Sequence, residues 1–233
     1  MGASSSPLVL FVCVANACRS PSAAALFAHR VAAEGVRSPV RVASAGTDAV
    51  PGSPRCEWAK TRLRSLGVDK KVIERGTAQP ITEGRLREAT LILSADRLVG
   101  SQIIRMDPSA RARLFTLKEA AVLSRLVLES QAADASASHD LDWLVAELDA
   151  TRGLLPLERP SRRPLGVGRR RPRHWSKRFD VPDAHSDGEH VRHATMFGEL
   201  QAACTLLSDA VTSVLSRQEL PALKPSEDRS SRR

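Results

Sequence analysis

The sequence predicts an α/β protein with three α/β/α layers, in which helices cover both faces of a parallel β-sheet. Short apolar runs of strand length alternate along the chain with longer amphipathic stretches, and this alternation is typical of parallel strands joined by crossover helices. The 233 residues are 42% hydrophobic, which is enough to bury a core without disulfides. Folds of this class bind ligands at the carboxyl ends of the strands, so the functional residues are expected there.

Each element follows from its hydrophobic pattern. Strands are predicted where apolar residues stand together in a short run, and helices where they recur every three or four positions. Pro21 favours the start of a helix. In chain order the predicted elements are a strand at 8–13, a helix at 21–35, a strand at 40–45, a helix at 54–67, a short helix at 81–88, a strand at 90–95, a helix at 97–106, a strand at 113–117 and helices at 117–130, 140–151 and 190–217.

A loop with a cysteine and an arginine connects the first predicted strand to the first helix. Cys13 ends the apolar run, and Arg19 follows after five residues, with Ser20 next. A loop at a helix N-terminus can turn successive backbone N–H groups inward, where the helix dipole also attracts an anion. These groups would favour the thiolate of Cys13, which is the nucleophilic form. The pattern predicts a phosphate-binding loop with a sulfur nucleophile, and the alternative is an inert core cysteine.

The segment Cys13–Pro21 resembles the signature loop of the low-molecular-weight protein-tyrosine phosphatases, usually Cys-x-Gly-Asn-x-Cys-Arg-Ser-Pro. Three later segments resemble strands of the same family and the residues that follow them, namely Val42–Thr47, Thr90–Arg97 and Arg113–Glu119. The resemblance extends to residue 130 and resumes near Asp180. It implies a four-stranded parallel sheet, with the phosphate-binding loop after the first strand and the second strand outside the first.

The resemblance also implies roles for individual residues. Cys13 would be the nucleophile that becomes a phosphocysteine, and Arg19 would hold the transferring phosphoryl group. Asn16 would brace the loop, Ser20 would hydrogen-bond the sulfur, and Ser44 would support Asn16 from the neighbouring strand end. The remaining phosphate-binding positions would be Val14, Ala15, Ala17 and Cys18.

The same family takes an aspartic acid from a distant C-terminal loop. The chemistry requires such a group, because the leaving group needs a proton and the water that attacks phosphocysteine needs a base. The segment Phe179–His185 is the equivalent loop, and Asp183 stands where the family has the acid. Asp180 is the second candidate, and both could be ordinary turn residues beside Pro182.

Departures from the family pattern bear on the substrate. Ala15 replaces the usual glycine, and its methyl group either fits the backbone angles or crowds the phosphate. Residues 184–185, Ala and His, replace the usual proline and aromatic pair, and the segment after Thr47 lacks the aromatic wall of the phosphotyrosine slot. The chain contains no tyrosine, and Trp58 or Trp175 are the candidates for a replacement wall.

We expect neither a metal nor another cofactor. His190 and His193 stand at the start of the last predicted helix, and no carboxylate or cysteine lies at a ligand spacing that completes a site with them. Cys18 either forms a reversible disulfide with Cys13, which would protect the nucleophile from over-oxidation, or is a small packing residue. A catalytic thiolate needs a reducing compartment, and the N-terminus predicts neither a signal peptide nor a membrane span. The cytoplasm is therefore the expected location.

The expected organisation is one domain formed by residues 1–130 and 179–217, an insertion at 131–178 and a disordered tail at 218–233. Residues 152–177 are rich in proline and arginine and supply much of the net charge of +9. This segment is either a solvated arm or a docking arm for an acidic partner, such as an anionic membrane or a phosphorylated tail. Nucleic acid is the least expected partner. Because the arm leads into the Asp183 loop, its ordering could place or withdraw that residue.

The resemblance implies a phosphomonoesterase acting on phosphotyrosine in proteins, and the tail of a bacterial tyrosine autokinase is a candidate partner. Three alternatives stay open: a phosphatase for another phosphorylated group, an arsenate reductase on the same scaffold, and a non-catalytic phosphate-binding module. The reductase would need a pair of closely spaced cysteines, whereas Cys56 and Cys204 are far apart in the sequence. A non-catalytic module would explain the departures but not the retention of Cys13, Arg19 and Ser20.

Overall fold

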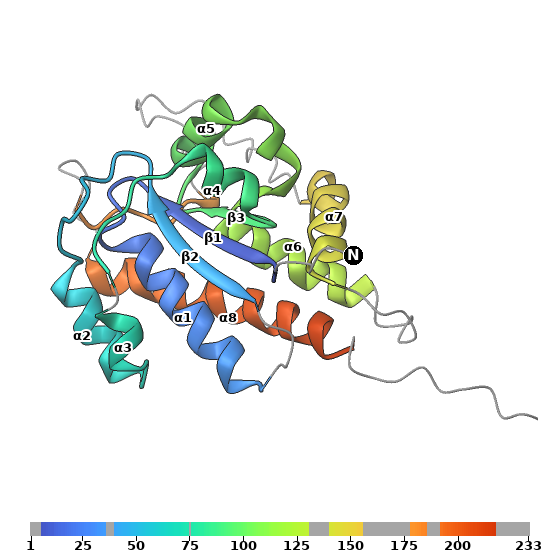
Figure 1. The fold of residues 1–233 in the computed structure, drawn as a ribbon. Coiled ribbons are helices and arrows are strands. Elements are labelled where there is room, and N and C mark those ends of the chain that lie inside the picture. The colour runs from blue at the N-terminus through green and yellow to red at the C-terminus, as the bar shows by residue number, and fades with distance from the viewer. Residues whose placement is uncertain are drawn as a thin grey trace, which may run out of the picture.

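A four-stranded parallel sheet forms the centre of the computed structural model, which describes residues 6–35, 40–74, 76–130, 140–155, 178–185 and 192–217. Its strands are β1 (Leu8–Cys13), β2 (Arg41–Gly46), β3 (Leu91–Ser94) and β4 (Leu114–Thr116), in the order β2-β1-β3-β4. The predicted fold class and the place of the second strand outside the first are thereby confirmed (Figure 1).

Helices cover both faces of the sheet (Figure 1). One layer contains α1 (Arg19–Ala33), α6 (Leu117–Ser130) and α8 (His193–Arg217), and α8 contacts both of the others. The opposite layer contains α4 (Glu83–Glu88) and α5 (Arg97–Met106). The remaining helices are α2 (Glu57–Ser65), α3 (Lys70–Ile73), α7 (Leu141–Thr151) and the 3₁₀ helices η1 (Pro108–Arg113) and η2 (Arg152–Leu154).

The alternation of side chains along β1 explains why this strand is apolar throughout. Val9 and Phe11 point into the core beneath α1, α6 and α8, whereas Leu10 and Val12 point into the core beneath α4 and α5. Each of these four side chains is at most 1% exposed. A strand that is buried on both faces needs apolar residues at consecutive positions. Because β1 is packed in this way, it holds Cys13, its last residue, in a fixed position.

Several predicted boundaries differ from the observed ones. Helix α1 begins at Arg19 instead of residue 21, so Pro21 is the third residue of the helix. The earlier start brings the predicted phosphate-binding loop directly into the first helical turn, where the Ser22 N–H donates to the Cys18 carbonyl. The short helices α3 and η1 were not predicted, although each begins after a capping aspartate, Asp69 and Asp107.

Part of the predicted insertion belongs to the core. Helix α7 buries Leu141, Leu144 and Leu148 in the cluster formed with α6 and α8. Arg152, the first residue of the predicted basic arm, packs with its guanidinium 4.1 Å from the centre of the Phe115 ring. The rest of the arm from residue 156, the linker at 131–139 and the tail at 218–233 lie outside the described residues.

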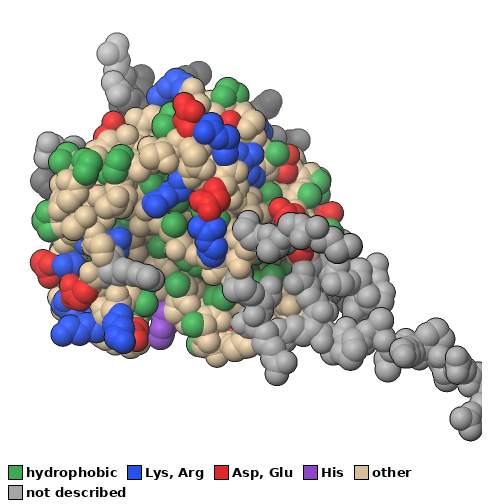
Figure 2. All heavy atoms as spheres, in the orientation of Figure 1, with side chains coloured by type: hydrophobic (Ala, Val, Ile, Leu, Met, Phe, Trp, Pro, Cys, Tyr) green, Lys and Arg blue, Asp and Glu red, His purple; other side chains and the backbone are tan. Residues whose placement is uncertain are grey.

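Within the described part, no helix is both long and apolar enough to cross a membrane. Positive and negative side chains are interspersed on the face seen in Figure 2. The described residues on this face therefore give no single-sign patch that would attract an acidic partner, and the basic arm remains a prediction from the sequence.

Candidate active site

The loop between β1 and α1 holds the Cys13 sulfur beside the hydroxyl of Ser20. The two atoms, Sγ and Oγ, are 3.0 Å apart and buried. The same hydroxyl donates to the Ala45 carbonyl at 3.1 Å and accepts from Nδ2 of Asn16 at 2.9 Å. Because a serine hydroxyl has one proton, Ser20 can donate to Ala45 or to a Cys13 thiolate. A thiolate would therefore be stabilised by a rotation of this hydroxyl.

Asn16 fixes the conformation of the loop. It is fully buried and has a φ of +50°, a left-handed conformation that asparagine tolerates better than most residues. Its Oδ1 accepts from the Gln79 backbone N–H at 3.0 Å, and its Nδ2 donates to Ser20. The expectation that Ser44 supports Asn16 is wrong, because the backbone of Gln79 fills that role and Ser44 lies within strand β2.

The loop also packs tightly against the end of β2. A Cβ atom at Gly46 would lie 2.7 Å from the Asn16 nitrogen and even closer to the Val14 carbonyl oxygen, so only glycine fits there. Backbone hydrogen bonds from Thr47 to Cys13 and from Asp48 to Val14, both 3.0 Å, continue this contact. The end of β2 therefore shapes the loop as directly as the loop's own residues do.

Ala15 does not strain the loop. Asn16 is the one non-glycine residue with positive φ among those described, so the backbone at position 15 does not require glycine. The Ala15 side chain is exposed. Of the two expectations for its methyl group, the structure supports the one in which it fits the backbone angles.

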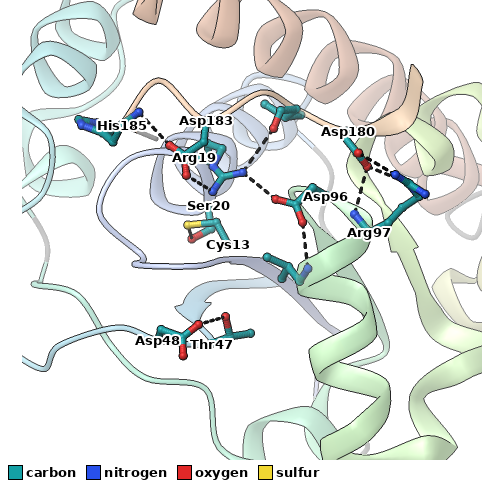
Figure 3. Close-up of polar contacts among 12 residues, drawn as sticks. Cys13, Arg19, Ser20, Thr47, Asp48, Asp96, Arg97, Asp180, Asp183 and His185 are labelled. Atoms are coloured by element: carbon teal, nitrogen blue, oxygen red, sulfur yellow. Dashed lines mark hydrogen bonds and ion pairs between the residues drawn. The ribbon is translucent and has the colours of Figure 1, made fainter. Parts of the chain in front are cut away.

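Arg19 is a buried cation that joins three segments (Figure 3). Its side chain is 5% exposed. The Nη1 atom donates to Oδ2 of Asp96 at 2.8 Å and to the Val181 carbonyl at 3.3 Å, and Nη2 pairs with Oδ2 of Asp183. A buried guanidinium needs such partners to offset its desolvation, and they fix its orientation at the end of the loop that begins with Cys13.

The two candidate acids occupy different positions (Figure 3). Asp183 faces Arg19, whereas Asp180 pairs with Arg97, both of whose contacting side-chain nitrogens lie 3.2 Å from its oxygens. The Val181 N–H donates to the Ala95 carbonyl at 2.8 Å, which fastens the loop to the end of β3. Asp183 is therefore the carboxylate that the fold brings to the Cys13–Arg19 loop, and Asp180 braces the segment that carries it.

A groove with a volume of about 400 Å³ opens beside these residues. Its lining includes four carboxylates, from Asp96, Asp180, Asp183 and Glu199, and two cations, from Arg19 and Lys118. The remaining lining side chains are aliphatic: Val14, Leu98, Val181 and Pro182. The described lining thus contains no aromatic ring. The site can hold a tetrahedral oxyanion beside a sulfur and a carboxyl group, with a polar, mainly acidic approach.

A family model described as low molecular weight phosphotyrosine protein phosphatase matches residues 8–125. The chain belongs to this phosphatase family. A protein-arginine-phosphatase of Bacillus subtilis (strain 168) is 34% identical over 115 residues, which are 48% of this chain and 70% of that protein. A protein-arginine-phosphatase of Geobacillus stearothermophilus is 32% identical over 111 residues, 48% of this chain and 69% of that protein.

A solved structure shares the fold. The crystal structure of YfkJ from Bacillus subtilis superposes with a TM-score of 0.57 at 20% identity, covering 91% of this chain and 98% of the other. In the present chain, the sequence analysis identified five site residues that the structure brings together: Cys13, Asn16, Arg19, Ser20 and Asp183. It did not identify Asp96, Gln79 or Gly46, all of which contact the loop or its arginine.

A signal for Asp96 was present in the sequence. It follows a predicted strand and caps the next helix, accepting from the Val99 N–H at 2.9 Å. Since the carboxyl ends of parallel strands meet at one edge, an aspartate in that position lies near the loop after β1. Gln79 gave no signal, because it contributes a backbone N–H that any residue carries.

Neither tryptophan is seen to replace the missing aromatic wall of this phosphatase-family site. Trp58 packs with its ring 5.8 Å from that of Phe197, where α2 meets α8, and it does not line the groove. Trp175 lies outside the described residues. Cys18 is a free, buried thiol whose pKa is raised, chiefly by burial and then by the neighbouring Cys56. Burial therefore favours the protonated thiol at Cys18 over the thiolate.

Proposed function

We propose that this protein is a cysteine-dependent phosphatase for phosphorylated side chains of proteins, with Cys13 as nucleophile, Arg19 as phosphate ligand and Asp183 as general acid and base. One observation carries the proposal. A single buried guanidinium bridges the loop that contains the Cys13 sulfur and the only described carboxylate of the 178–185 segment that faces this loop.

In the first step, the phosphate of the substrate enters the loop and takes over the Nη2 donor of Arg19 that pairs with Asp183. Asp96 and the Val181 carbonyl keep Nη1 in place, so the guanidinium does not lose its orientation. The Cys13 thiolate attacks phosphorus, and the bond from phosphorus to the leaving atom breaks. Protonated Asp183 gives its proton to that leaving atom, and the phosphoryl group remains on sulfur.

In the second step, water attacks the phosphocysteine. The carboxylate of Asp183 takes a proton from the water, the P–S bond breaks, and inorganic phosphate leaves with the thiolate restored. Ser20 would stabilise the Cys13 thiolate both before the first step and after the second, because its hydroxyl can turn from the Ala45 carbonyl to the sulfur. The two steps consume one water per phosphate and need no cofactor.

The favoured substrate group is phosphoarginine. A guanidino group is polar and cationic, and carboxylates bind it through paired hydrogen bonds. The groove places the carboxylates of Asp96, Asp180 and Glu199 beside Asp183, and these three pair with Arg19, Arg97 and Lys118. Its described lining residues include no aromatic ring to stack on a phenyl group. Two relatives above 30% identity bear the name protein-arginine-phosphatase. Phosphotyrosine is the second candidate, because the matching family model bears its name.

The arsenate-reductase alternative receives less support. Cys204 is fully buried within α8, with its sulfur 3.5 Å from the Ala23 carbonyl. It is not part of the group of side chains around Cys56. The two cysteines outside the loop therefore do not form the resolving pair that this reaction would need.

The test is phosphate release by the reduced full-length protein from three peptides of one sequence that carry phosphoarginine, phosphotyrosine or phosphoserine. We expect the highest kcat/KM with phosphoarginine. The Cys13→Ser variant should show no turnover and should form no phosphocysteine. A higher kcat/KM with phosphotyrosine would select the second candidate. Tight binding of phosphate or vanadate without turnover of any peptide would contradict the phosphatase and favour a binding module.

A further inference from the structure

A second group of chemically active side chains lies behind the phosphate-binding loop. Cys18, Cys56, His185 and His193 bring their ligand atoms, two sulfurs and two imidazole nitrogens, within 4.8 Å of one another. The Nε2 atoms of the two histidines are 3.1 Å apart. None of the four takes part in the proposed phosphoryl transfer as a reacting group.

The four residues come from four separate segments. Cys18 precedes Arg19 in the phosphate-binding loop, Cys56 precedes α2, His185 belongs to the Asp183 segment, and His193 is the first residue of α8. The sequence argument against His193 as a metal ligand considered local spacing alone. The fold supplies two cysteines near His193 from positions far away in the chain, which local spacing does not reveal. His190 lies outside the described residues.

Contacts outside the cluster hold its members in this arrangement. The Cys56 N–H donates to the Ala17 carbonyl at 2.8 Å, which fixes the start of α2 against the loop. The His193 ring lies 5.3 Å from the Trp58 ring. The His185 N–H donates to Oδ1 of Asp183 at 3.0 Å. The cluster is thus supported by backbone hydrogen bonds and by packing.

We propose that these four side chains bind one Zn²⁺ ion. Two thiolates and two imidazoles are a donor set typical of zinc, whereas magnesium and calcium prefer oxygen ligands. Zinc–sulfur bonds of about 2.3 Å and zinc–nitrogen bonds of about 2.0–2.1 Å place tetrahedral ligand atoms roughly 3.3–3.8 Å apart. The two histidine nitrogens, 3.1 Å apart, lie just below that range, and the 4.8 Å limit for the group lies about 1 Å above it, so zinc binding would draw the ligand atoms together by up to that amount.

Four protein ligands complete a tetrahedral shell, so the site has a structural character without an open position for a reacting water. Binding would displace the protons of both thiols into solvent. Cys18 is buried, Cys56 and His193 are partly exposed, and His185 is exposed. The ion can therefore enter from the His185 side without opening the core.

The site would join the two halves of the proposed active centre. Cys18 is adjacent in sequence to Arg19, and His185 is two residues from Asp183. A metal that binds both Cys18 and His185 would restrict the Asp183 segment relative to the phosphate-binding loop. It would also link His185 to His193 at the start of α8. The Asp183 position would then depend on zinc as well as on the Arg19 contact.

The binding test uses the full chain with Cys13→Ser as background, which removes the catalytic sulfur as a competing zinc ligand. Under reducing conditions, titration against a chromophoric chelator should give one Zn²⁺ per chain. Cobalt substitution should give the intense visible bands of a tetrahedral site and sulfur-to-cobalt charge-transfer bands. This test does not depend on the proposed function, because the background protein has no nucleophile.

Two ligand variants and two matched controls locate the site. Cys56→Ser and His193→Gln should each weaken zinc binding by more than about 100-fold, beyond the 10–100-fold typical of a lost outer partner. Cys204→Ser and His29→Gln change the same residue types outside the cluster and should bind like the background protein. Zinc should raise the unfolding midpoint of the background and the controls but not that of the ligand variants, with folding of each verified by circular dichroism.

Three outcomes would overturn the proposal. They are no stoichiometric zinc binding by the reduced background protein, equal affinity in the ligand variants and their controls, and cobalt spectra that lack sulfur charge-transfer bands. A Cys18–Cys56 disulfide that persists under the reducing conditions of the titration would also count against it, because the thiols would then be unavailable to the metal.

Discussion

Arg19 is the residue on which the candidate site depends most. It is nearly buried, it follows the phosphate-binding loop directly, and its partners come from the ends of two other segments. A guanidinium in that position is useful only if it keeps one orientation, because a phosphate oxygen must meet its N–H groups at fixed angles. Asp96 supplies that orientation from outside the loop.

Asp96→Asn should therefore reduce kcat/KM through Arg19. A hydrogen bond to a charged group contributes about 1.5–3 kcal/mol, which corresponds to a loss of roughly 10- to 100-fold at about 1.4 kcal/mol per tenfold. Asparagine still caps a helix well, so the unfolding midpoint should change little. The measurement is steady-state hydrolysis together with thermal unfolding.

Asp107→Asn is the matched control, since Asp107 also caps a helical segment and pairs with an arginine, Arg113, at 3.2 Å. It lies outside the groove, so its activity should stay near that of the wild type. Equal activity of the Asp96 and Asp107 variants would show that Arg19 needs no orientation from Asp96.

Asp183→Asn and Asp180→Asn separate the two candidate acids. Loss of a general acid costs about 10²–10⁴-fold, and the loss should be larger for phenyl phosphate than for p-nitrophenyl phosphate, because nitrophenolate leaves without a proton. Only Asp183→Asn should show this dependence on the leaving group. Asp180→Asn should weaken the Arg97 contact and lower the rate equally for both substrates.

A leaving-group dependence in Asp180→Asn instead of Asp183→Asn would reverse the assignment. The comparison is internally controlled, since both variants remove one carboxylate from the same segment. Circular dichroism and the unfolding midpoint of each variant check that the loss arises at the site.

At the scale of elements, the contact between β2 and the phosphate-binding loop gives a sharp prediction. Gly46→Ala places a methyl group against the Val14 carbonyl and the Asn16 nitrogen. These are backbone atoms, which cannot move aside as a side chain can, so we expect a loss of about 1–3 kcal/mol in the free energy of unfolding and weaker phosphate binding. Chemical denaturation and vanadate inhibition measure the two effects.

Gly84→Ala is the control for that substitution. Gly84 lies in α4, a methyl group there meets no atom within 4 Å, and its φ is ordinary. Alanine should therefore leave stability unchanged or raise it slightly through its better helix propensity. Equal unfolding free energies and equal vanadate inhibition for Gly46→Ala and Gly84→Ala would contradict the tight packing of β2 against the loop.

The sequence predicted the elements better than the contacts between them. The continuous apolar run at 8–12 and the amphipathic stretches after each strand identified four strands and most helices, because periodicity is a local property. Helices α3 and η1 were missed because segments this short carry too few residues for a period. The expectation of a four-stranded sheet with the second strand outside the first came from the family resemblance and was confirmed.

Contacts over long separations were the harder part. Asp96 meets Arg19 across 77 positions, and Cys56 and His193 meet Cys18 from two other segments. Such pairs depend on where crossover connections return to the sheet, and local patterns indicate this only for a residue such as Asp96 that directly follows a predicted strand. The same reason explains the wrong role for Ser44, since its partner position is occupied by the backbone of a residue from a separate loop.

At the scale of the whole molecule, the C-terminal helix completes a core that the N-terminal part cannot close alone. The family model ends at residue 125, yet α8 packs against both α1 and α6, and its buried residues join the main hydrophobic cluster. The Asp183 segment runs just before α8 in the chain.

Two neighbouring leucines of α8 test this role. Leu207 is fully buried, whereas Leu206 is 40% exposed. Leu207→Ala should lower the free energy of unfolding by about 2–5 kcal/mol, because it removes buried methyl groups and leaves a cavity. Leu206→Ala should change it by no more than about 0.5 kcal/mol. Urea unfolding with an unchanged m-value is the measurement, since a constant m-value shows that the same surface is exposed in all variants. Equal losses for the two variants would mean that α8 does not pack on α1 and α6 through its Leu207 face.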